Sequence, residues 1–224
     1  MFDRVASRYD TLNSLMSAGL HHRWRERAAD RAELGPGDSA LDVCCGTGDL
    51  ALELVERVST DGYVIGCDFS EPMLDLARDK AAARGVDGVR FEWADALELP
   101  YDSGRFDAVT VGFGVRNFAD RDRGLAEMAR VLRPGGRLVV LEFTSPCRFP
   151  FSTFYAVWFD RIVPVLGRLT SDPGAYAYLA ESVRSFPDPP GLAAKMDGVG
   201  LERIRYTILA GGIVTIHSGV KATS

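Results

Sequence analysis

The sequence predicts an α/β protein built on a mostly parallel β-sheet with an antiparallel hairpin at one edge. Between Ser39 and Phe143, short apolar runs alternate with longer segments of helical periodicity, which is the pattern of repeated βαβ units. Several runs are continuously apolar, as expected of strands that helices cover on both faces. Near the C-terminus, two strand-like runs are separated only by Ala210-Gly211-Gly212, which predicts a hairpin at a sheet edge.

The individual elements follow from the same patterns. The parallel strands are expected at Ser39–Val43, Tyr63–Cys67, Val89–Trp93, Phe106–Val111 and Arg137–Phe143. The helices between them are expected at Leu50–Val58, Met73–Ala83 and Arg123–Leu132, the last ending at Arg133-Pro134-Gly135-Gly136 because neither proline nor glycine sustains a helix. The hairpin strands are expected at Leu201–Leu209 and Gly212–Val220.

A further helical pattern precedes the first strand, from Leu12 to Leu34, and Gly35-Pro36-Gly37-Asp38 ends it. It carries a basic stretch that we expect on the polar side of the helix, made of His21, His22, Arg23, Arg25 and Arg27.

Length, composition and charge restrict the class of protein. The chain has 224 residues, which suits one α/β domain, and its 46% hydrophobic residues can bury a full core. Lys and Arg total 26 against 31 Asp and Glu, so the net charge is −5. This balance argues against nucleic acid as a partner, because proteins that grip phosphate backbones usually carry the opposite sign.

Cysteine usage and the termini indicate a reduced cytoplasmic protein. The four cysteines, Cys44, Cys45, Cys67 and Cys147, form no CxxC pair, so we expect neither a disulfide framework nor a metal site. The first ten residues are charged where a signal peptide needs an apolar core. The longest stretch without Asp, Glu, Lys or Arg, Tyr206–Val220, is too short to span a bilayer.

A glycine-rich turn follows the first strand and opens the next helix. Gly46, Gly48 and Ala51 match the G-x-G-x-x-A pattern of dinucleotide-binding turns, in which glycine lets the backbone approach a ligand closely. Asp68 closes the second strand 22 residues after Gly46, where an acid commonly binds a ribose diol. Two interpretations therefore compete: a dinucleotide such as NAD or FAD, or another adenosine cofactor.

Acidic residues near the turn favour the second interpretation. Asp49 starts the helix, Asp42 precedes the turn and Asp95 follows the third strand. Carboxylates there would repel a pyrophosphate by roughly a few kcal/mol at an effective dielectric near 20. They would suit a cofactor without phosphate that carries a sulfonium and an ammonium group, which is the charge pattern of S-adenosylmethionine. Taken alone, Asp49 would be an ordinary helix N-terminal charge and Asp68 an ordinary strand-end carboxylate.

Longer motifs carry a resemblance to a known family. LDVCCGTGDLA (41–51), CDFSEPML (67–74) and RVLRPGGRLVVLEF (130–143) resemble class I S-adenosylmethionine methyltransferases. GVRN (114–117), YAYLAESVRSFP (176–187) and HSGVK (217–221), in this order, resemble the ubiquinone/menaquinone-biosynthesis C-methyltransferase family over essentially the whole chain.

The resemblance implies a Rossmann-like domain with a seven-stranded sheet over residues 1–224. Within it, residues 1–34 would form a helical N-terminal lid and residues 147–187 an insertion that caps the substrate. The implied reaction is C-methylation of a polyprenylated hydroquinone with S-adenosylmethionine. We rank demethylmenaquinol above a benzoquinol of ubiquinone biosynthesis or another small phenol. An NAD-dependent oxidoreductase remains the alternative from a different class.

The resemblance and the strand ends together nominate site residues. The expected cofactor-binding residues are Gly46, Thr47, Gly48, Asp68, Asp95, Ala96 and Gly112, the last standing where the family often has serine. The expected catalytic residues are Arg116, which would stabilise a phenolate or organise a water, Asn117, which would donate or accept a hydrogen bond, and Glu142, which would orient Arg116 or accept a proton.

Three other features have weaker assignments. His217 is a possible base, although a lone histidine in an apolar edge strand is more often structural. Tyr9 would close over the cofactor as part of the lid, or would simply pack within its helix. The segment Phe149–Phe159 holds six aromatic residues and is interpreted as core, as a homodimer face, or as a lid that meets a prenyl tail at the inner membrane surface.

Overall fold

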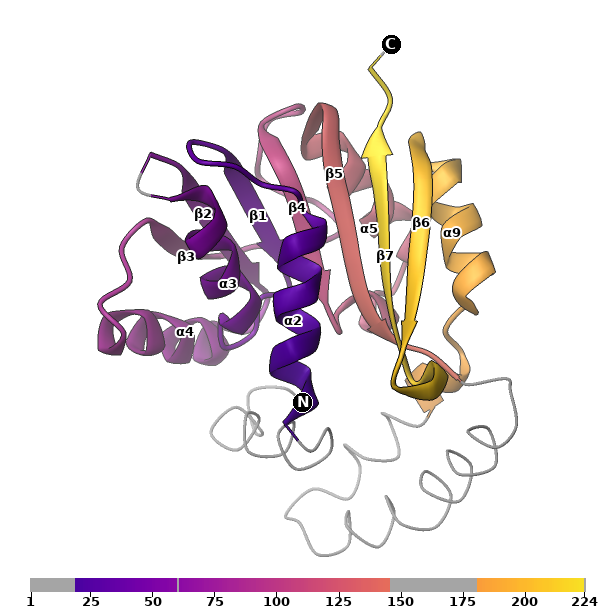
Figure 1. The fold of residues 1–224 in the computed structure, drawn as a ribbon, viewed down its shortest axis with the longest axis horizontal. Helices are drawn as coiled ribbons and strands as arrows, with labels where there is room; N and C mark the ends of the chain where they lie inside the picture. The colour runs from indigo at the N-terminus through magenta and orange to yellow at the C-terminus, as the bar shows by residue number, and fades with distance from the viewer. Residues whose placement is uncertain (1–18, 60, 146–180, 224) are drawn as a thin grey trace, which may run out of the picture.

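Seven strands form one mixed sheet in the order β3-β2-β1-β4-β5-β7-β6 (Figure 1). The computed structural model describes residues 19–59, 61–145 and 181–223. The first five strands pair in parallel, while β7 is antiparallel to both β5 and β6. The strands are β1 (Ser39–Val43), β2 (Tyr63–Asp68), β3 (Val89–Trp93), β4 (Phe106–Gly112), β5 (Leu132–Phe143), β6 (Leu201–Leu209) and β7 (Val214–Lys221). The predicted fold class, mostly parallel with an antiparallel edge, is confirmed.

Helices cover both faces of this sheet. On one face lie α2 (Leu20–Arg31), α3 (Asp49–Val58) and α4 (Glu71–Ala83), and on the other lie α5 (Arg121–Val131) and α9 (Pro189–Gly198). Two short 3-10 helices, η2 (Val115–Asn117) and η4 (Ala210–Gly212), complete the described elements. Each face buries its own apolar cluster, which is why β1, β4 and β5 are apolar on both sides.

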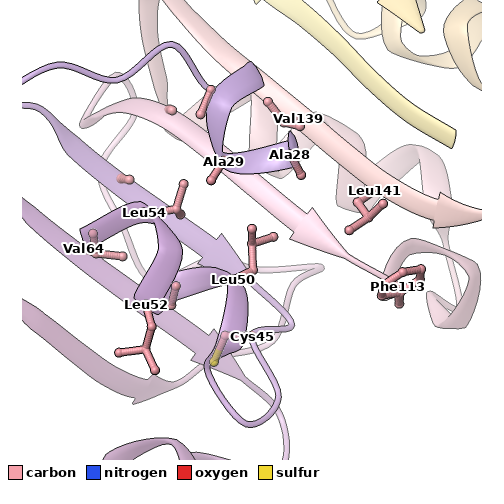
Figure 2. Close-up of a cluster of buried hydrophobic side chains, with 14 of the residues drawn as sticks. Ala28, Ala29, Cys45, Leu50, Leu52, Leu54, Val64, Phe113, Val139 and Leu141 are labelled. Atoms are coloured by element: carbon pink, nitrogen blue, oxygen red, sulfur yellow. The ribbon is translucent and has the colours of Figure 1, made fainter. Parts of the chain in front are cut away.

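The cluster on the α2 and α3 side packs these helices against the sheet. Ala28 and Ala29 of α2 pack toward Val139 and Leu141 of β5, and Leu50 of α3 points into the same layer (Figure 2). The alanines have no larger side chain to hold α2 away from the sheet, so this helix lies close against β4 and β5. Phe113 extends the cluster beyond the end of β4.

Two helices begin with side-chain caps that the sequence supplies locally. The Asp120 side chain accepts a hydrogen bond from the Arg123 backbone N–H at the start of α5, and Asp188 does the same for Gly191 at the start of α9. Proline follows Asp188 in the first turn, where its missing N–H costs nothing.

The structure corrects the expected start of the fifth strand. We expected Arg137, but β5 begins at Leu132, which pairs with Phe106 of β4. Regular pairing resumes at Arg137, so residues 133–136 form an irregularity inside the strand rather than only a stop after α5. Gly136 fits there because a Cβ would lie 2.9 Å from the backbone oxygens of Arg133 and Asp107.

The expected polar side of the N-terminal helix is also wrong in part. His21 and Arg25 are 3% and 8% exposed, because they share a face of α2 with Trp24, Ala28 and the following small residues. His22, Arg23 and Arg27 are exposed, as expected. The described helix covers Leu20–Arg31, and residues 12–18 of the predicted helix lie outside the described residues.

Candidate active site

The carboxyl ends of the five parallel strands meet at one edge of the sheet, the lower edge in Figure 1. At this edge, β1 leads into the glycine turn, β2 ends at Asp68 and β4 ends at Gly112. Doubly wound sheets place their ligands at this edge. The topology therefore brings together residues that are up to a hundred positions apart in the chain.

The two glycines of the turn serve different purposes. Gly46 and Gly48 have φ angles of 54° and 81°, in the left-handed region that disfavours other residues. A Cβ on Gly48 would lie 2.8 Å from Cζ of Phe91, so this glycine is needed for packing against β3. A Cβ on Gly46 would meet no atom of the described chain within 4 Å, so this glycine borders open space at the site.

Asp68 and Asp95 shape the backbone at the ends of β2 and β3. Asp68 accepts hydrogen bonds from the backbone N–H of Gly46 and of Ser70, both at 2.9 Å. Asp95 accepts one from the N–H of Leu97 at 2.9 Å. Asp68 thus joins the glycine turn to the end of β2, while Ala96 lies half-buried between Asp95 and Leu97.

Asp49 does not present a free negative charge, contrary to expectation. Its Oδ1 lies 2.6 Å from Nζ of Lys80 in α4, and its Oδ2 lies 3.3 Å from Nη1 of Arg25 in α2. Burial alone would raise the pKa of Asp49, but Arg25 and Lys80 outweigh it and hold the pKa below its usual value. Lys80 also donates to Oγ1 of the buried Thr47 at 3.0 Å. The expected negative lining is therefore compensated at the start of α3.

Asp42 is a buried carboxyl group beneath the turn. It is 1% exposed, and its Oδ1 accepts a 2.6 Å hydrogen bond from the Thr110 hydroxyl on β4. Burial raises the pKa of Asp42 to about 7, against the opposing effects of Thr110 and of Arg25. Asp42 is thus only partly ionised near neutral pH. Of the three acids that favoured a cationic ligand, Asp95 at the end of β3 is unaffected by these two corrections.

An ion pair joins η2, which follows β4, to the end of β5. Nη1 of Arg116 lies 2.8 Å from Oε1 of Glu142, and the Arg116 backbone N–H donates to Oε2 at 3.2 Å. Glu142 also accepts from the Phe143 N–H at 2.8 Å and is fully buried. Of the two predicted roles for Glu142, this geometry matches the orienting role, because three donors already occupy its oxygens.

Arg116 keeps unsatisfied donor capacity. It is 9% exposed, and Nη1 also donates to the carbonyl of Phe113. Its Nε is buried with no hydrogen-bond partner in the described part of the chain. The amide of Asn117 donates to the same Phe113 carbonyl at 3.5 Å. The structure thus places Arg116 and Asn117 of η2 together with Glu142 of β5, just after the end of β4.

Gly112 has little room for a side chain. A Cβ there would lie 3.3 Å from Cδ2 of Leu50, so the serine that the family often has would need this leucine to yield slightly. The side-chain contact implied by the family is absent here, and Gly112 offers only backbone groups.

His217 is a structural residue in the geometry observed. It lies on β7, which is flanked by β5 and β6 and is therefore not an edge strand as expected. Its Nε2 lies 2.9 Å from the carbonyl oxygen of Pro189, which ties the start of α9 to the sheet. Burial lowers the pKa of His217 against this hydrogen bond, so the ring is held neutral.

The adjacent cysteines are inert packing residues. Cys45 is buried, Cys44 is half-buried, and both are free thiols. Burial raises the pKa of each well above its usual value, which disfavours the reactive thiolate. In the described ranges, no group of three His, Cys, Asp or Glu side chains could hold a metal ion, and no helix is long and apolar enough to cross a bilayer.

Several predictions lie outside the described residues. These are Tyr9, most of the lid at residues 1–34, most of the cap at residues 147–187 and the aromatic segment Phe149–Phe159. By contrast, the buried Arg25 and the half-buried Lys80 lie beside the glycine turn and were missed by sequence reasoning. The spacing of Arg25 from Trp24, Ala28 and Ala29 is the signal that could have placed it on the buried face.

Comparison with known proteins identifies the class of this site. The model of the ubiE/COQ5 methyltransferase family matches residues 1–221. A demethylmenaquinone methyltransferase of Thermus thermophilus is 52% identical over 220 residues, covering 98% of this chain and 99% of that protein. A protein of the same name from Deinococcus radiodurans is 48% identical, with 99% and 91% covered. A Marinomonas protein named ubiquinone/menaquinone biosynthesis C-methyltransferase UbiE is 43% identical, with 99% and 89% covered.

Solved structures share the fold at low sequence identity. A SAM-dependent methyltransferase from Aquifex aeolicus superposes with a TM-score of 0.65 at 17% identity, and 88% of each chain is covered. A possible histamine N-methyltransferase from Thermotoga maritima gives a TM-score of 0.69 at 19% identity, with 98% of this chain and 97% of that chain covered. On the full-length family match and the relatives above 40% identity, this chain belongs to the ubiE/COQ5 methyltransferase family, a class of S-adenosylmethionine-dependent enzymes, as predicted.

Proposed function

We propose that this chain transfers the methyl group of S-adenosylmethionine to a ring carbon of a polyprenylated demethylmenaquinol. The observation that carries the choice of substrate is the 52% identity to a demethylmenaquinone methyltransferase over nearly the full length of both chains. A second relative of that name is 48% identical, whereas the relative with the broader ubiquinone/menaquinone name is 43% identical. Methylation of a benzoquinol is the second candidate, on the strength of that broader name.

The residues at the strand ends fit S-adenosylmethionine. Open space borders Gly46, so a ligand can approach the backbone of the turn. We assign Gly46, Thr47, Gly48, Asp68, Asp95, Ala96 and Gly112 to holding it. Asp68 holds the glycine turn to the end of β2 through the N–H groups of Gly46 and Ser70, which places a carboxylate where a ribose diol would lie. The donor, when bound, supplies a methyl group activated by a positively charged sulfur.

Arg116 would stabilise the phenolate form of the quinol. The ring carbon becomes nucleophilic when the neighbouring phenol loses its proton, which passes to water. Because a guanidinium does not release its proton at neutral pH, Arg116 acts as a fixed cation and hydrogen-bond donor. Its buried Nε, which has no partner within the described residues, is the group that such an oxygen would satisfy.

The remaining residues position this cation. Glu142 holds the guanidinium through Nη1, and Asn117 shares the Phe113 carbonyl with it.

As the new carbon–carbon bond forms, the bond from the methyl carbon to sulfur breaks, giving S-adenosylhomocysteine. The ring then loses its hydrogen as a proton to water and becomes aromatic again. Alignment of the ring carbon with the methyl group would supply much of the rate.

A side-by-side assay tests the substrate. Wild-type protein is given S-adenosylmethionine with either reduced demethylmenaquinone or a reduced demethylated benzoquinone, with prenyl tails of equal length. We expect kcat/KM to be at least about tenfold higher for the naphthoquinol, which corresponds to about 1.4 kcal/mol. Equal or faster turnover of the benzoquinol would support the second candidate, and turnover of neither would refute a quinol substrate.

We also propose that the protein is a homodimer that works as a peripheral protein at the inner face of the cytoplasmic membrane, because a polyprenyl tail resides in lipid. Arg148, Arg161 and Arg168 flank the aromatic segment and would each contribute about 1 kcal/mol near anionic headgroups. Co-sedimentation with vesicles that contain anionic lipid, and light scattering for mass in solution, test these two statements.

A further inference from the structure

Arg25 is a buried arginine beside the glycine turn whose charge the predicted cofactor contacts do not use. Its side chain is 9% exposed, and Nη1 lies 3.3 Å from Oδ2 of Asp49. This contact is an ion pair without hydrogen-bond geometry, so the buried Nη1 has no hydrogen-bond acceptor in the described part of the chain. A buried donor without an acceptor is costly, and it is costlier when it is charged.

Asp49 leaves this arginine only partly compensated. The carboxylate is shared, because Oδ1 receives the Lys80 ammonium at 2.6 Å while Oδ2 faces Arg25. Asp42 also interacts with the charge of Arg25, but burial raises its pKa to about 7 and leaves it only partly ionised near neutral pH. A ligand carboxylate would accept a hydrogen bond from the unused donor and balance the charge of Arg25.

The position of Arg25 favours the amino-acid end of the methyl donor. Asp49 is the first residue of α3, so the guanidinium reaches the positive end of this ten-residue helix, next to Thr47 and Gly48. The ring of Phe113, just beyond β4, lies 6.0 Å from the guanidinium carbon and limits it on another side. Gly46, on the same turn, borders the open space.

We propose that Arg25 is a specificity-determining residue that binds the carboxylate of the methyl donor, with Asp49 and Lys80 fixing the guanidinium at the start of α3. This inference rests on the S-adenosylmethionine site described above. In this role, α2 takes part in cofactor recognition. In a purely structural role, Arg25 would only connect α2 to α3 through its contact with Asp49. The two roles differ in whether affinity depends on the ligand carboxylate.

Calorimetry with two matched ligands separates these roles. The ligands are S-adenosylhomocysteine and its decarboxylated form, which lacks only the carboxylate. We expect Arg25→Gln to weaken binding of S-adenosylhomocysteine about 10- to 100-fold, the loss typical of a charge-assisted hydrogen bond. Binding of the decarboxylated ligand should change less than about twofold. Arg27→Gln is the matched control, because Arg27 is an exposed arginine on the same helix and should alter neither affinity.

Equal weakening of both ligands, or of neither, would overturn the proposal. If Arg25→Gln does not fold, Arg25→Lys keeps the charge but loses the planar donor pair, and it should weaken S-adenosylhomocysteine about 3- to 10-fold more than the decarboxylated ligand. Failure of the quinol proposal is a separate result: wild-type protein would then bind S-adenosylhomocysteine, and discriminate by carboxylate, without methylating any quinol.

Discussion

Glu142 of β5 anchors Arg116 at two points, with Oε1 2.8 Å from Nη1 and Oε2 3.2 Å from the backbone nitrogen. The pair is buried, so the guanidinium has one well-defined place behind β4. A cation held in this way needs no reorganisation when negative charge develops on a bound substrate, which is how preorganised donors accelerate reactions. Removal of either partner should therefore affect stability and turnover differently.

Arg116→Ala should lower kcat by about 100- to 1,000-fold, the loss typical of one donor to a developing oxyanion. The affinity for S-adenosylhomocysteine should stay within about threefold, because Arg116 lies beyond the residues assigned to the cofactor. Turnover and calorimetry on the same preparation check both statements. Arg123→Ala, which removes an exposed arginine of α5, serves as the control. Unchanged turnover would exclude Arg116 from the site.

Glu142→Gln should destabilise the protein by about 3–5 kcal/mol, because it leaves the Arg116 charge buried without its counterion. The double variant Arg116→Gln with Glu142→Gln removes both charges and should recover much of that loss, yet it should remain inactive. Urea unfolding and turnover, measured on the wild type, Arg116→Gln, Glu142→Gln and the double variant, give the coupling energy. Recovery of activity in the double variant would contradict the role of the cation.

Gly46→Ala and Gly48→Ala should separate ligand binding from folding. At Gly46 the added methyl group enters the open space where we place the cofactor, so affinity for S-adenosylhomocysteine should fall about tenfold or more. The free energy of unfolding should fall only by roughly 1–2 kcal/mol, the cost of placing alanine in the left-handed conformation of Gly46. At Gly48 the same backbone strain is present, and the added methyl group also overlaps with Phe91. This overlap should lower the free energy of unfolding by about 1–3 kcal/mol more. Phe91→Leu should partly rescue Gly48→Ala and should not rescue Gly46→Ala.

Asp42 should make stability fall as pH rises. Its pKa is about 7 in the folded protein against an ordinary value of 3.8 in the unfolded chain, so the folded state binds the proton more tightly. The corresponding stability is fully present below pH 3.8 and is lost as pH rises toward 7. Between pH 5 and pH 8 the Asp42 contribution should decrease by about 2–3 kcal/mol.

Asp42→Asn removes this titration and keeps an acceptor for Thr110. The free energy of unfolding of the variant minus that of the wild type, measured in urea, should therefore increase from pH 5 to pH 8. A difference that does not change with pH would show that Asp42 is ionised throughout this range.

Local patterns predicted most of the sheet. The bounds of β1 and β3 match the expected Ser39–Val43 and Val89–Trp93, because a glycine with positive φ, Gly37 or Gly88, lies just before each strand. The bounds of α4 differ at the start, where the helix begins at Glu71 rather than Met73, since Pro72 is accommodated in its first turn. The number of strands and the parallel pairing followed from the family resemblance and the βαβ pattern, whereas the order of the strands was not predicted.

Charges that pair over long distances in the sequence escaped prediction. Asp49 looks like a free acid because its partners, Arg25 and Lys80, lie 24 positions before it and 31 after it, on helices whose packing no local pattern specifies. His217 looked like an edge residue because the order β5-β7-β6 reverses the sequence order of the last two strands. Both errors concern tertiary placement rather than residue chemistry.

The most direct test of the central claim follows the methyl group itself. Wild-type protein is incubated with reduced demethylmenaquinone and S-adenosylmethionine whose methyl group carries deuterium, and the product is oxidised before mass spectrometry. Methylation at carbon predicts a labelled product that still oxidises to a quinone, with loss of one ring hydrogen. A labelled product that resists oxidation would place the methyl group on oxygen, and S-adenosylmethionine binding without any labelled quinone would contradict the proposed reaction altogether.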